Sequence, residues 1–313
     1  MDNKHISAVI VLILLFIAGA LIFLTAYFNL PNNIKDITII KNIDSPQFTG
    51  ETIFEPLSDE KLIYENIRFQ NKMISYNVDD ECSVNNKAKI RNAFLILTEN
   101  SDLSFFEVNG QADIQVDCFI DVIGNENDKV IGEGGPISIL NTSKYSLINS
   151  GSVKLYAEDT CSYPLLELHE ILHVLGFKHS LDKNSLMYNV SDCNQRLDQD
   201  NIDNINNLYK DPILPDLEIK DLKVNVSSAN LNFEIKILNI GLSQSEDTNV
   251  SIFEDGKFIS SYNLGKLSIG SGKIISNDNV KLNQNTKEIT FIVDYENKLD
   301  EINKENNKKA IIL

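Results

Sequence analysis

Histidine and cysteine are both scarce in this sequence, with four copies of each among 313 residues. The cysteines, Cys82, Cys118, Cys161 and Cys193, form no C-x-x-C pair and no zinc-ligand spacing, which argues against a thiolate metal site. An even number behind an apolar N-terminal segment is instead typical of two disulfides in an exported protein. Sequence order favours Cys82–Cys118 and Cys161–Cys193, one of three connectivities, with four buried free thiols as the alternative.

Positive charge is in short supply as well. The chain has 28 Lys and Arg residues against 45 Asp and Glu, which gives a formal net charge of −17. Nucleic-acid binding needs a basic surface, so this balance argues against nucleic acid as a partner. The acidity is typical of an exposed domain that is kept soluble by its charge.

Charge is missing altogether from Ile6 to Leu30. The length of this run suits a transmembrane helix, which needs roughly 20 apolar residues. A cleaved signal peptide is the alternative, but Leu24-Thr25-Ala26 is a poor cleavage site. We therefore predict an uncleaved signal anchor over residues 1–30, with one pass through the cell membrane. The flanking charges do not fix the orientation. The cysteines favour an extracellular position for the rest of the chain.

Residues 31–65 are polar and lack periodicity, which predicts a stalk or linker with room for one strand, and a pro-segment is the alternative. Helical and strand-like patterns then alternate up to residue 210 and predict an α+β domain over 66–210. The expected elements are strands at 73–78, 103–108, 112–118, 137–140 and 152–156, a turn cluster at 132–136, and helices at 86–99, 165–175 and 200–209.

Two prolines within the short stretch 211–216 mark a linker between domains. Seven strand-like segments follow within 217–313, and their spacing is typical of a β-sandwich. Asp255-Gly256 predicts a two-residue hairpin turn, because both positions tolerate positive φ. The expected strands are 217–226, 231–238, 250–254, 257–262, 274–280, 288–294 and 310–313.

Three of the four histidines lie within one stretch, HEILHVLGFKH, at positions 169–179. On a helix, His169 and His173 are four residues apart and lie on the same face, where they can bind one metal ion. Gly176 permits the left-handed turn that ends a helix. The chain then reverses, and His179 can return as the third ligand.

Three neutral imidazoles with one open position describe a catalytic zinc site. Zinc lowers the pKa of a water molecule towards ~7 and polarises a carbonyl group. Glu170 lies about 100° around the helix from His169, so it is poorly placed as a ligand but suits a general base. A histidine pair buried in a core is the alternative interpretation. It explains neither Glu170 nor Gly176.

The stretch resembles the HExxHxxGxxH motif of the metzincin zinc endopeptidases, and Met187 in Ser185-Leu186-Met187-Tyr188 matches their methionine turn. Ser180, Tyr188 and the helix at 200–209 are similar to those of the matrixins, the M10 type of peptidase. The resemblance covers 66–210 and is densest from 165 onwards. It implies a mixed twisted sheet, an active-site helix, a C-terminal helix and hydrolysis of peptide bonds. Gly134-Gly135-Pro136 resembles the edge-strand region that pairs with an extended substrate.

The chain departs from the matrixin pattern in three ways. No histidines remain for a structural zinc, so we predict one catalytic ion. A cysteine-switch motif is missing, so latency by that route is not supported. Tyr188 follows Met187 directly, so we do not assign it as a ligand, and Met187 is expected to pack beneath the site. A Cys161–Cys193 bridge would tie the loop that resembles the matrixin specificity loop, residues 189–194, to the front of the helix.

The C-terminal segment from residue 215 resembles a CARDB domain, an immunoglobulin-like adhesion module of cell-surface proteins. Pro215-Asp216-Leu217, Asn239-Ile240-Gly241 and the acidic, Asn-rich ending at 294–307 carry the resemblance. It implies binding to a surface protein or glycan. A spacer that holds the peptidase off the membrane is the alternative.

These observations predict a membrane-anchored extracellular zinc metalloendopeptidase with a β-sandwich appendage. His169, His173 and His179 are the expected zinc ligands, Glu170 is the expected general base, and a protein or peptide is the expected substrate. The alternative is a cell-surface binding protein whose metzincin-like domain holds zinc without cleaving anything.

Overall fold

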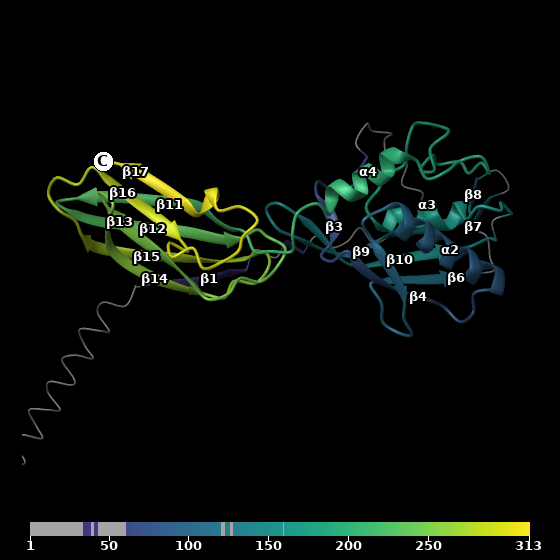
Figure 1. Cartoon of the computed structure of the whole chain (residues 1–313), viewed down its shortest axis with the longest axis horizontal. Helices are drawn as coiled ribbons and strands as arrows, with labels where there is room; N and C mark the ends of the chain where they lie inside the picture. Colours follow the sequence, from purple (N-terminus) through teal and green to yellow (C-terminus); the bar gives the residue numbers. More distant parts are fainter. Residues whose placement is uncertain (1–33, 39–40, 43–60, 120–122, 126–127, 159) are drawn as a thin grey trace, which may run out of the picture.

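The computed structural model describes residues 34–38, 41–42, 61–119, 123–125, 128–158 and 160–313. These residues form an α/β body and a β-sandwich that follow one another along the long axis of the molecule (Figure 1). The predicted anchor at 6–30 and most of the predicted stalk lie outside the described residues. None of the described helices is long and apolar enough to cross a membrane.

A mixed sheet forms the centre of the α/β body. The strand order is β2-β9-β10-β6-β4-β5, and β3 pairs with β10 off this path. β10 runs parallel to β6 and β3 but antiparallel to β9, which confirms the mixed sheet that the sequence predicts. The strands are β2 (Lys41–Asn42), β3 (Ile67–Phe69), β4 (Met73–Val78), β5 (Ser104–Glu107), β6 (Ile114–Cys118), β9 (Gly132–Asn141) and β10 (Ser146–Leu155), with a small ribbon of β7 (Ile123–Asn125) and β8 (Asp128–Val130).

Helix α2 (Val84–Asn100) covers part of this sheet. It begins at Ser83, whose side chain accepts a hydrogen bond from the backbone N–H of Asn86 and so caps the helix. The predicted apolar stripe is buried and consists of Ile90, Ala93, Phe94 and Leu97, which recur every three or four positions. A disulfide between Cys82 and Cys118 joins the start of α2 to the end of β6.

Helix α3 (Leu165–Val174) packs across β9 and β10 and is buried on almost every side. Helix α4 (Gln199–Leu208) lies nearer the surface and begins at Asp198, whose side chain accepts from Asn201 N–H. Both helices lie within two residues of their predicted bounds. The core beneath them includes Leu168, Leu172 and Ile205, each at most 1% exposed.

The prediction of a turn at 132–136 is wrong, because these residues form the first half of β9. A Cβ on Gly134 would lie 2.0 Å from the backbone oxygen of Glu170, and a Cβ on Gly132 would lie 2.7 Å from its carboxylate. The glycines therefore let the strand approach the helix closely rather than turn. Pro136 lies where the register with β10 shifts, a position at which a strand tolerates proline.

The second body is a sandwich of two four-stranded sheets, β1-β15-β12-β11 and β14-β13-β16-β17. All seven predicted strands are present, and Asp255 and Gly256 form the predicted hairpin turn with φ of 46° and 77°. Alternate residues of both sheets meet in one apolar core. The strands are β11 (Leu217–Ser227), β12 (Asn230–Asn239), β13 (Thr248–Glu254), β14 (Lys257–Gly265), β15 (Ser271–Lys281), β16 (Glu288–Val293) and β17 (Lys308–Ile312), with a short 3-10 helix η1 (Glu305–Asn307) before the last.

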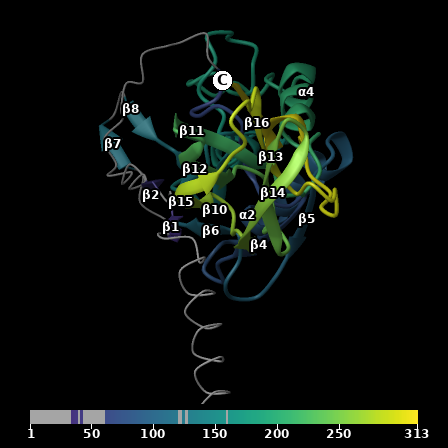
Figure 2. The same ribbon diagram turned by 90° about the vertical axis from the view of Figure 1, so that its left-hand side faces the viewer.

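The described part of the predicted stalk is not a free spacer. β1 (Ile34–Thr38) adds an antiparallel strand to β15 of the sandwich, and β2 pairs with the end of β9 in the α/β body. Figure 2 looks along the long axis and shows β1 and β2 together on the flank opposite β13, β14 and β16. Leu62 and Ile63 pack against the α/β core as well. One strand was allowed for in this stretch, but the lack of periodicity gave no sign of two strands that pair with different sheets.

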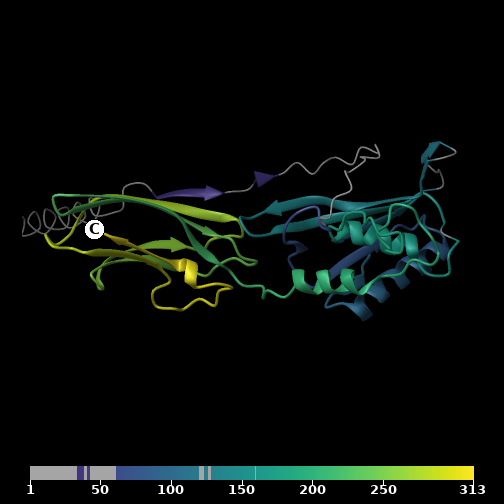
Figure 3. The same cartoon turned by 90° about the horizontal axis from the view of Figure 1, so that it is seen from above.

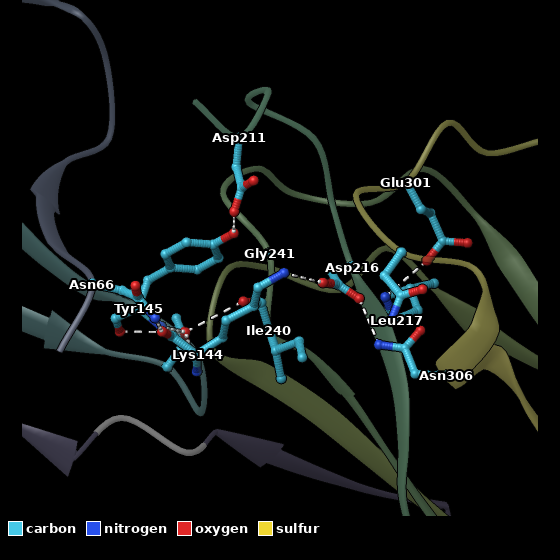
Figure 4. Close-up of polar contacts among 12 residues, drawn as sticks. Asn66, Lys144, Tyr145, Asp211, Asp216, Leu217, Ile240, Gly241, Glu301 and Asn306 are labelled. Carbon is cyan, nitrogen blue, oxygen red and sulfur yellow. Dashed lines mark hydrogen bonds and ion pairs between the residues drawn. The ribbon is translucent and has the colours of Figure 1, made fainter. Parts of the chain in front are cut away.

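The tip of the β9–β10 hairpin docks on the sandwich. The Lys144 ammonium lies 3.1 Å from the Asp216 carboxylate, whose side chain is 1% exposed. Tyr145 donates its hydroxyl to Asp211 at 2.5 Å, within the predicted linker (Figure 4). An apolar cluster lies beside these bonds and contains Leu140, Tyr145, Leu147, Leu242, Ile269 and Ile302. The linker is therefore an ordered junction between the two bodies.

Candidate active site

Helix α3 ends where the sequence predicts. Gly176 has φ of +95°, and its N–H donates to the carbonyl oxygen of His173 at 3.0 Å. The N–H of Phe177 then donates to Leu172 O at 3.0 Å, which closes the last turn. A residue with a side chain is excluded at Gly176 for a second reason, because its Cβ would lie 2.5 Å from Ile67. The reversal brings His179 back towards the helix.

The three histidines converge through their Nε2 atoms. Nε2 of His173 lies 3.0 Å from Nε2 of His169 and 3.2 Å from Nε2 of His179. A tetrahedral zinc ion with bonds of about 2.0–2.1 Å separates its ligand nitrogens by about 3.3 Å, so the spacing fits zinc. The triad is the one group of at least three His, Cys, Asp or Glu side chains in the described part of the chain that is placed to hold a metal.

Hydrogen bonds at the Nδ1 atoms of two histidines determine that their Nε2 lone pairs face the centre of the triad. Nδ1 of His169 lies 2.7 Å from the carbonyl oxygen of Leu186, and Nδ1 of His173 lies 2.8 Å from that of Phe177. A carbonyl oxygen only accepts, so each Nδ1 carries the proton and each Nε2 presents a lone pair. Two facing lone pairs at 3.0 Å repel one another unless a cation lies between them. The donor chemistry therefore fits a metal ion.

The protonation states agree with this geometry. Burial lowers the pKa of His169 to about 4, against the raising effect of the hydrogen bond to Leu186 and with a smaller lowering effect of the neighbouring His179. Burial and both neighbouring imidazoles lower the pKa of His173 well below its ordinary value. Both rings are therefore neutral at pH 7, which is the form that binds metal.

Glu170 lies between α3 and β9 and is 5% exposed. Burial raises the pKa of its carboxyl to about 8, and the charge of Glu133 adds to the rise. Its carboxylate faces Gly132, the first residue of β9. The catalytic candidate is thus held at the edge strand of the sheet.

Glu133 and Tyr156 near this carboxylate were missed by the sequence analysis. Tyr156 donates its hydroxyl to Glu133 at 2.9 Å; burial, this hydrogen bond and the charges of Glu133 and Glu170 raise the pKa of Tyr156. The available signal for this site was Glu133, the one acidic residue within the glycine-rich stretch 132–135. It was hidden because the run was interpreted as a turn.

The predicted methionine turn, residues 185–188, contacts the triad through the carbonyl oxygen of Leu186. Met187 is 1% exposed, and its carbonyl oxygen accepts from Ser180 N–H at 2.7 Å, just after His179. Ser185 donates to Asp198, the residue that caps α4, at 3.2 Å. The turn therefore joins the third histidine to the last helix. The contribution of Ser185 and Asp198 was also not predicted.

The second disulfide joins Cys161 and Cys193, with a Cα–Cα distance of 5.4 Å. It ties the loop after the methionine turn to the segment before α3, so both pairs are those that sequence order favours. A closure over 32 residues contributes roughly 3–4 kcal/mol by the loop-entropy estimate. A pocket of about 460 Å³ opens beside His179, lined by Met187 and the start of α4 rather than by the predicted specificity loop at 189–194.

Comparisons with known proteins match one protein family to each of the two bodies. The matrixin family model matches residues 68–210, and the CARDB family model matches residues 214–311. No curated protein matches the chain.

Two solved structures are similar to part of the chain. The solution NMR structure of a Methanosarcina acetivorans domain is 24% identical, covers 32% of this chain and 90% of its own, and has a TM-score of 0.29. The crystal structure of a Pyrococcus furiosus CARDB domain in complex with di-metal ions is 22% identical, covers 31% of this chain and 85% of its own, and has a TM-score of 0.28. With the histidine triad, which implies a catalytic zinc ion, the family matches show that this chain carries a matrixin metalloendopeptidase domain followed by a CARDB domain.

Proposed function

We propose that His169, His173 and His179 hold the zinc ion and that Glu170 is the general base of peptide hydrolysis. The observation that supports this most is the convergence of three Nε2 lone pairs, two of them aimed by carbonyl oxygens on Nδ1. Zinc, when bound, supplies the Lewis acidity that polarises a scissile carbonyl and lowers the pKa of water.

Glu170 suits proton transfer because of its surroundings. Burial and the charge of Glu133 raise its pKa from the ordinary carboxyl range towards neutral pH, where a carboxyl can both take up and release a proton. It takes the proton of the attacking water and passes it to the leaving amine. Glu133 and the Tyr156 hydroxyl stay outside this transfer. Burial and, after it, the charge of Glu133 keep the Glu170 pKa high, and the Tyr156 hydroxyl donates a hydrogen bond to Glu133.

We further propose that the enzyme works outside the cell and is tethered by residues 1–30. The two disulfides support an oxidising location, and the apolar run Ile6–Leu30 supports the tether. The proposed order is anchor, stalk 31–65, peptidase 66–210, linker 211–216 and CARDB domain 217–313. A surface protein or glycan is the proposed partner of the CARDB domain.

The test compares the full chain with Glu170→Gln and with Glu99→Gln, a matched change on α2. Zinc content is measured by mass spectrometry, and cleavage is measured on a mixed peptide library. We expect both variants to bind one zinc ion, and Glu170→Gln alone to lose about 10²–10⁴-fold in kcat. A zinc-loaded Glu170→Gln protein with full activity would remove Glu170 from the mechanism. A zinc-free wild type would remove the ligand assignment.

A further inference from the structure

A hollow of about 550 Å³ lies where the peptidase domain passes into the linker. Its walls are the start of β4, a residue of β5 and the segment from Tyr209 to Ile213 that follows α4. Viewed from above, the chain crosses from α4 to the sandwich on the flank opposite to β1 and β2 (Figure 3). The hollow shares no lining residue with the pocket beside His179. Its size and its place at a domain boundary are typical of sites for small ligands.

Arg68 lines this hollow although it is only 1% exposed. Its guanidinium donates three hydrogen bonds of 2.9–3.1 Å, all to backbone carbonyl oxygens, those of Phe69, Leu208 and Gln70. A guanidinium has five N–H donors, so two of them have no acceptor in the described part of the chain. Carbonyl groups carry no net charge, so these three bonds do not neutralise the cation.

Arg68 forms no ion pair with any described residue, whereas buried arginines are almost always paired. Its guanidinium carbon lies 4.3 Å from the centre of the Tyr209 ring. Burial lowers the pKa of Arg68, and Tyr209, Tyr145 and Asp211 offset this only in part. The Asp211 carboxylate instead accepts the hydroxyl of Tyr145 (Figure 4). The wall of the hollow therefore holds a buried positive charge that no described carboxylate neutralises.

Tyr209 adds a second buried donor to the same wall. Its hydroxyl oxygen accepts from the N–H of Phe69 at 2.9 Å, and its own proton has no acceptor among the described residues. Tyr209 is 2% exposed, so water reaches its hydroxyl poorly. The exposed Lys210 beside it also lines the hollow. Unused donors and positive charge thus meet here, and a carboxylate is the ligand that satisfies both.

Apolar side chains form the opposite part of the hollow. Met73, Phe106 and Ile213 are 67%, 44% and 40% exposed. Exposed apolar side chains around a concave site are typical of a binding surface, and an inorganic anion would leave them uncovered. Asn71 and Asp211 also line the hollow and can accept hydrogen bonds from N–H groups. A fatty acid offers no N–H groups, whereas a peptide does.

We propose that this hollow binds the free C-terminus of a short apolar peptide, with the carboxylate at Arg68 and the last side chains against Met73 and Phe106. Peptides of this class are released when a peptide bond is hydrolysed, so a product of the enzyme fits the hollow. Binding there does not depend on Glu170 or on the histidine triad. The site is therefore a second peptide site, separate from the catalytic centre.

The first experiment is isothermal titration calorimetry on the full chain carrying Glu170→Gln. The probe is acetyl-Ala-Leu-Phe with a free carboxylate, and it is compared with the same peptide as its C-terminal amide and with decanoate. We expect the free acid to bind at least about tenfold more tightly than either of the others. Equal affinity for acid and amide, or no binding up to about 1 mM, would overturn the proposal. Tighter binding of decanoate would also overturn it, because the ligand would then be a lipid-like carboxylate.

Matched variants in the same chain place the probe in the hollow. Phe106→Ser and Lys210→Ala are each expected to weaken binding of the free acid at least about fivefold, because they remove an apolar contact and a positive charge. Leu95→Ser on α2 and Lys257→Ala on the sandwich change equally exposed side chains outside the hollow and should leave the affinity unchanged. Arg68→Lys keeps the charge but loses the planar fork, so the preference for acid over amide should fall below about threefold.

Arg68 is buried, so its variant is judged only if it unfolds at the wild-type temperature. Phe106 and Lys210 are exposed, and their variants decide the question if Arg68→Lys does not fold. Wild-type affinity in folded Phe106→Ser and Lys210→Ala proteins would overturn the proposal.

A free carboxylate can also bind zinc at the histidine triad, so the titration is repeated with a chelator. We expect the affinity to stay the same. Amide hydrogen exchange then locates the probe, and we expect protection in 69–73, 104–107 and 209–213 but not in 169–179. Binding that is lost with the chelator, or protection confined to 169–179, would overturn the proposal by assigning the peptide to the active site.

Discussion

The carbonyl oxygen of Leu186 lies 2.7 Å from Nδ1 of His169, so the residue before Met187 orients a metal ligand. The methionine turn thus acts through its backbone, and the buried Met187 side chain holds that backbone in place. Groups that orient a ligand affect metal affinity almost as strongly as the ligands do.

Met187→Ala is expected to weaken zinc binding at least tenfold and to lower the free energy of unfolding by about 2–5 kcal/mol. The reason is the cavity left under the triad, which lets the Leu186 carbonyl move. Met187→Leu conserves the volume and is expected to cost less than about 1.5 kcal/mol. Competition titration with a chelator and chemical denaturation measure the two effects. Equal zinc affinity in all three proteins would contradict the backbone role.

Gly134→Ala is expected to reduce kcat/KM by at least tenfold and to destabilise the fold by about 1–3 kcal/mol. The added Cβ meets the backbone of Glu170 at 2.0 Å, so β9 or α3 must shift at the catalytic residue. Gly110→Ala is the control, because a Cβ there meets nothing within 4 Å although its φ is +95°. It is expected to cost about 1 kcal/mol without changing kcat/KM. Peptide cleavage and thermal unfolding distinguish the two.

Lys144→Met tests the junction between the domains. It leaves the Asp216 carboxylate buried with a single charge-free donor from Asn306, and we expect a loss of about 1–3 kcal/mol. The estimate is below that for a fully buried pair because Lys144 remains 32% exposed. Lys223→Met breaks an exposed pair with Glu234 and is expected to leave the free energy of unfolding almost unchanged. Chemical denaturation followed in each domain reports the difference, and equal losses would contradict a structural role for the pair.

The histidine triad could be predicted from the sequence because its residues all lie close together in the chain, within 169–179. His169, Glu170 and His173 share one helix, and Gly176 and His179 follow within one turn, so spacing alone predicts their meeting. The sandwich strands were predictable for a similar reason, since alternation and Asp255-Gly256 are local signals. Long-range contacts carry no such signal. Lys144 and Asp216 are 72 positions apart, and nothing near either one indicates the other.

The turn predicted at 132–136 was wrong because a local signal, the glycine content, pointed to the wrong structure. In a single sequence Gly132–Pro136 has the composition of a turn, and only the position of Glu170 shows why a strand needs glycine there. The sheet partners of 34–38 and 41–42 could not be predicted, although the sequence left room for one strand here, because an edge strand of five residues or fewer needs no periodic apolar pattern when the partner sheets are already formed.

Glu301 predicts how the stability of the CARDB domain depends on pH. Burial raises the pKa of its carboxyl to about 7, against the hydrogen bonds that it accepts from Leu217 and Asn307. The folded state therefore binds a proton more tightly than the unfolded state, whose carboxyl has a pKa near 4.5. The stabilising effect of that proton is complete below pH 4.5 and is lost as the pH rises through about 7.

We accordingly expect the free energy of unfolding of the sandwich to fall by about 1–2 kcal/mol between pH 5 and pH 8, less than the full shift implies because Glu301 is only partly buried. Glu301→Gln removes the titrating group, so its unfolding free energy should change little over the same range. Denaturation at a series of pH values, followed by tyrosine signals of the sandwich, gives both curves. Parallel curves for the two proteins would assign the pH dependence to another group and leave the Leu217 and Asn307 bonds as the main role of Glu301.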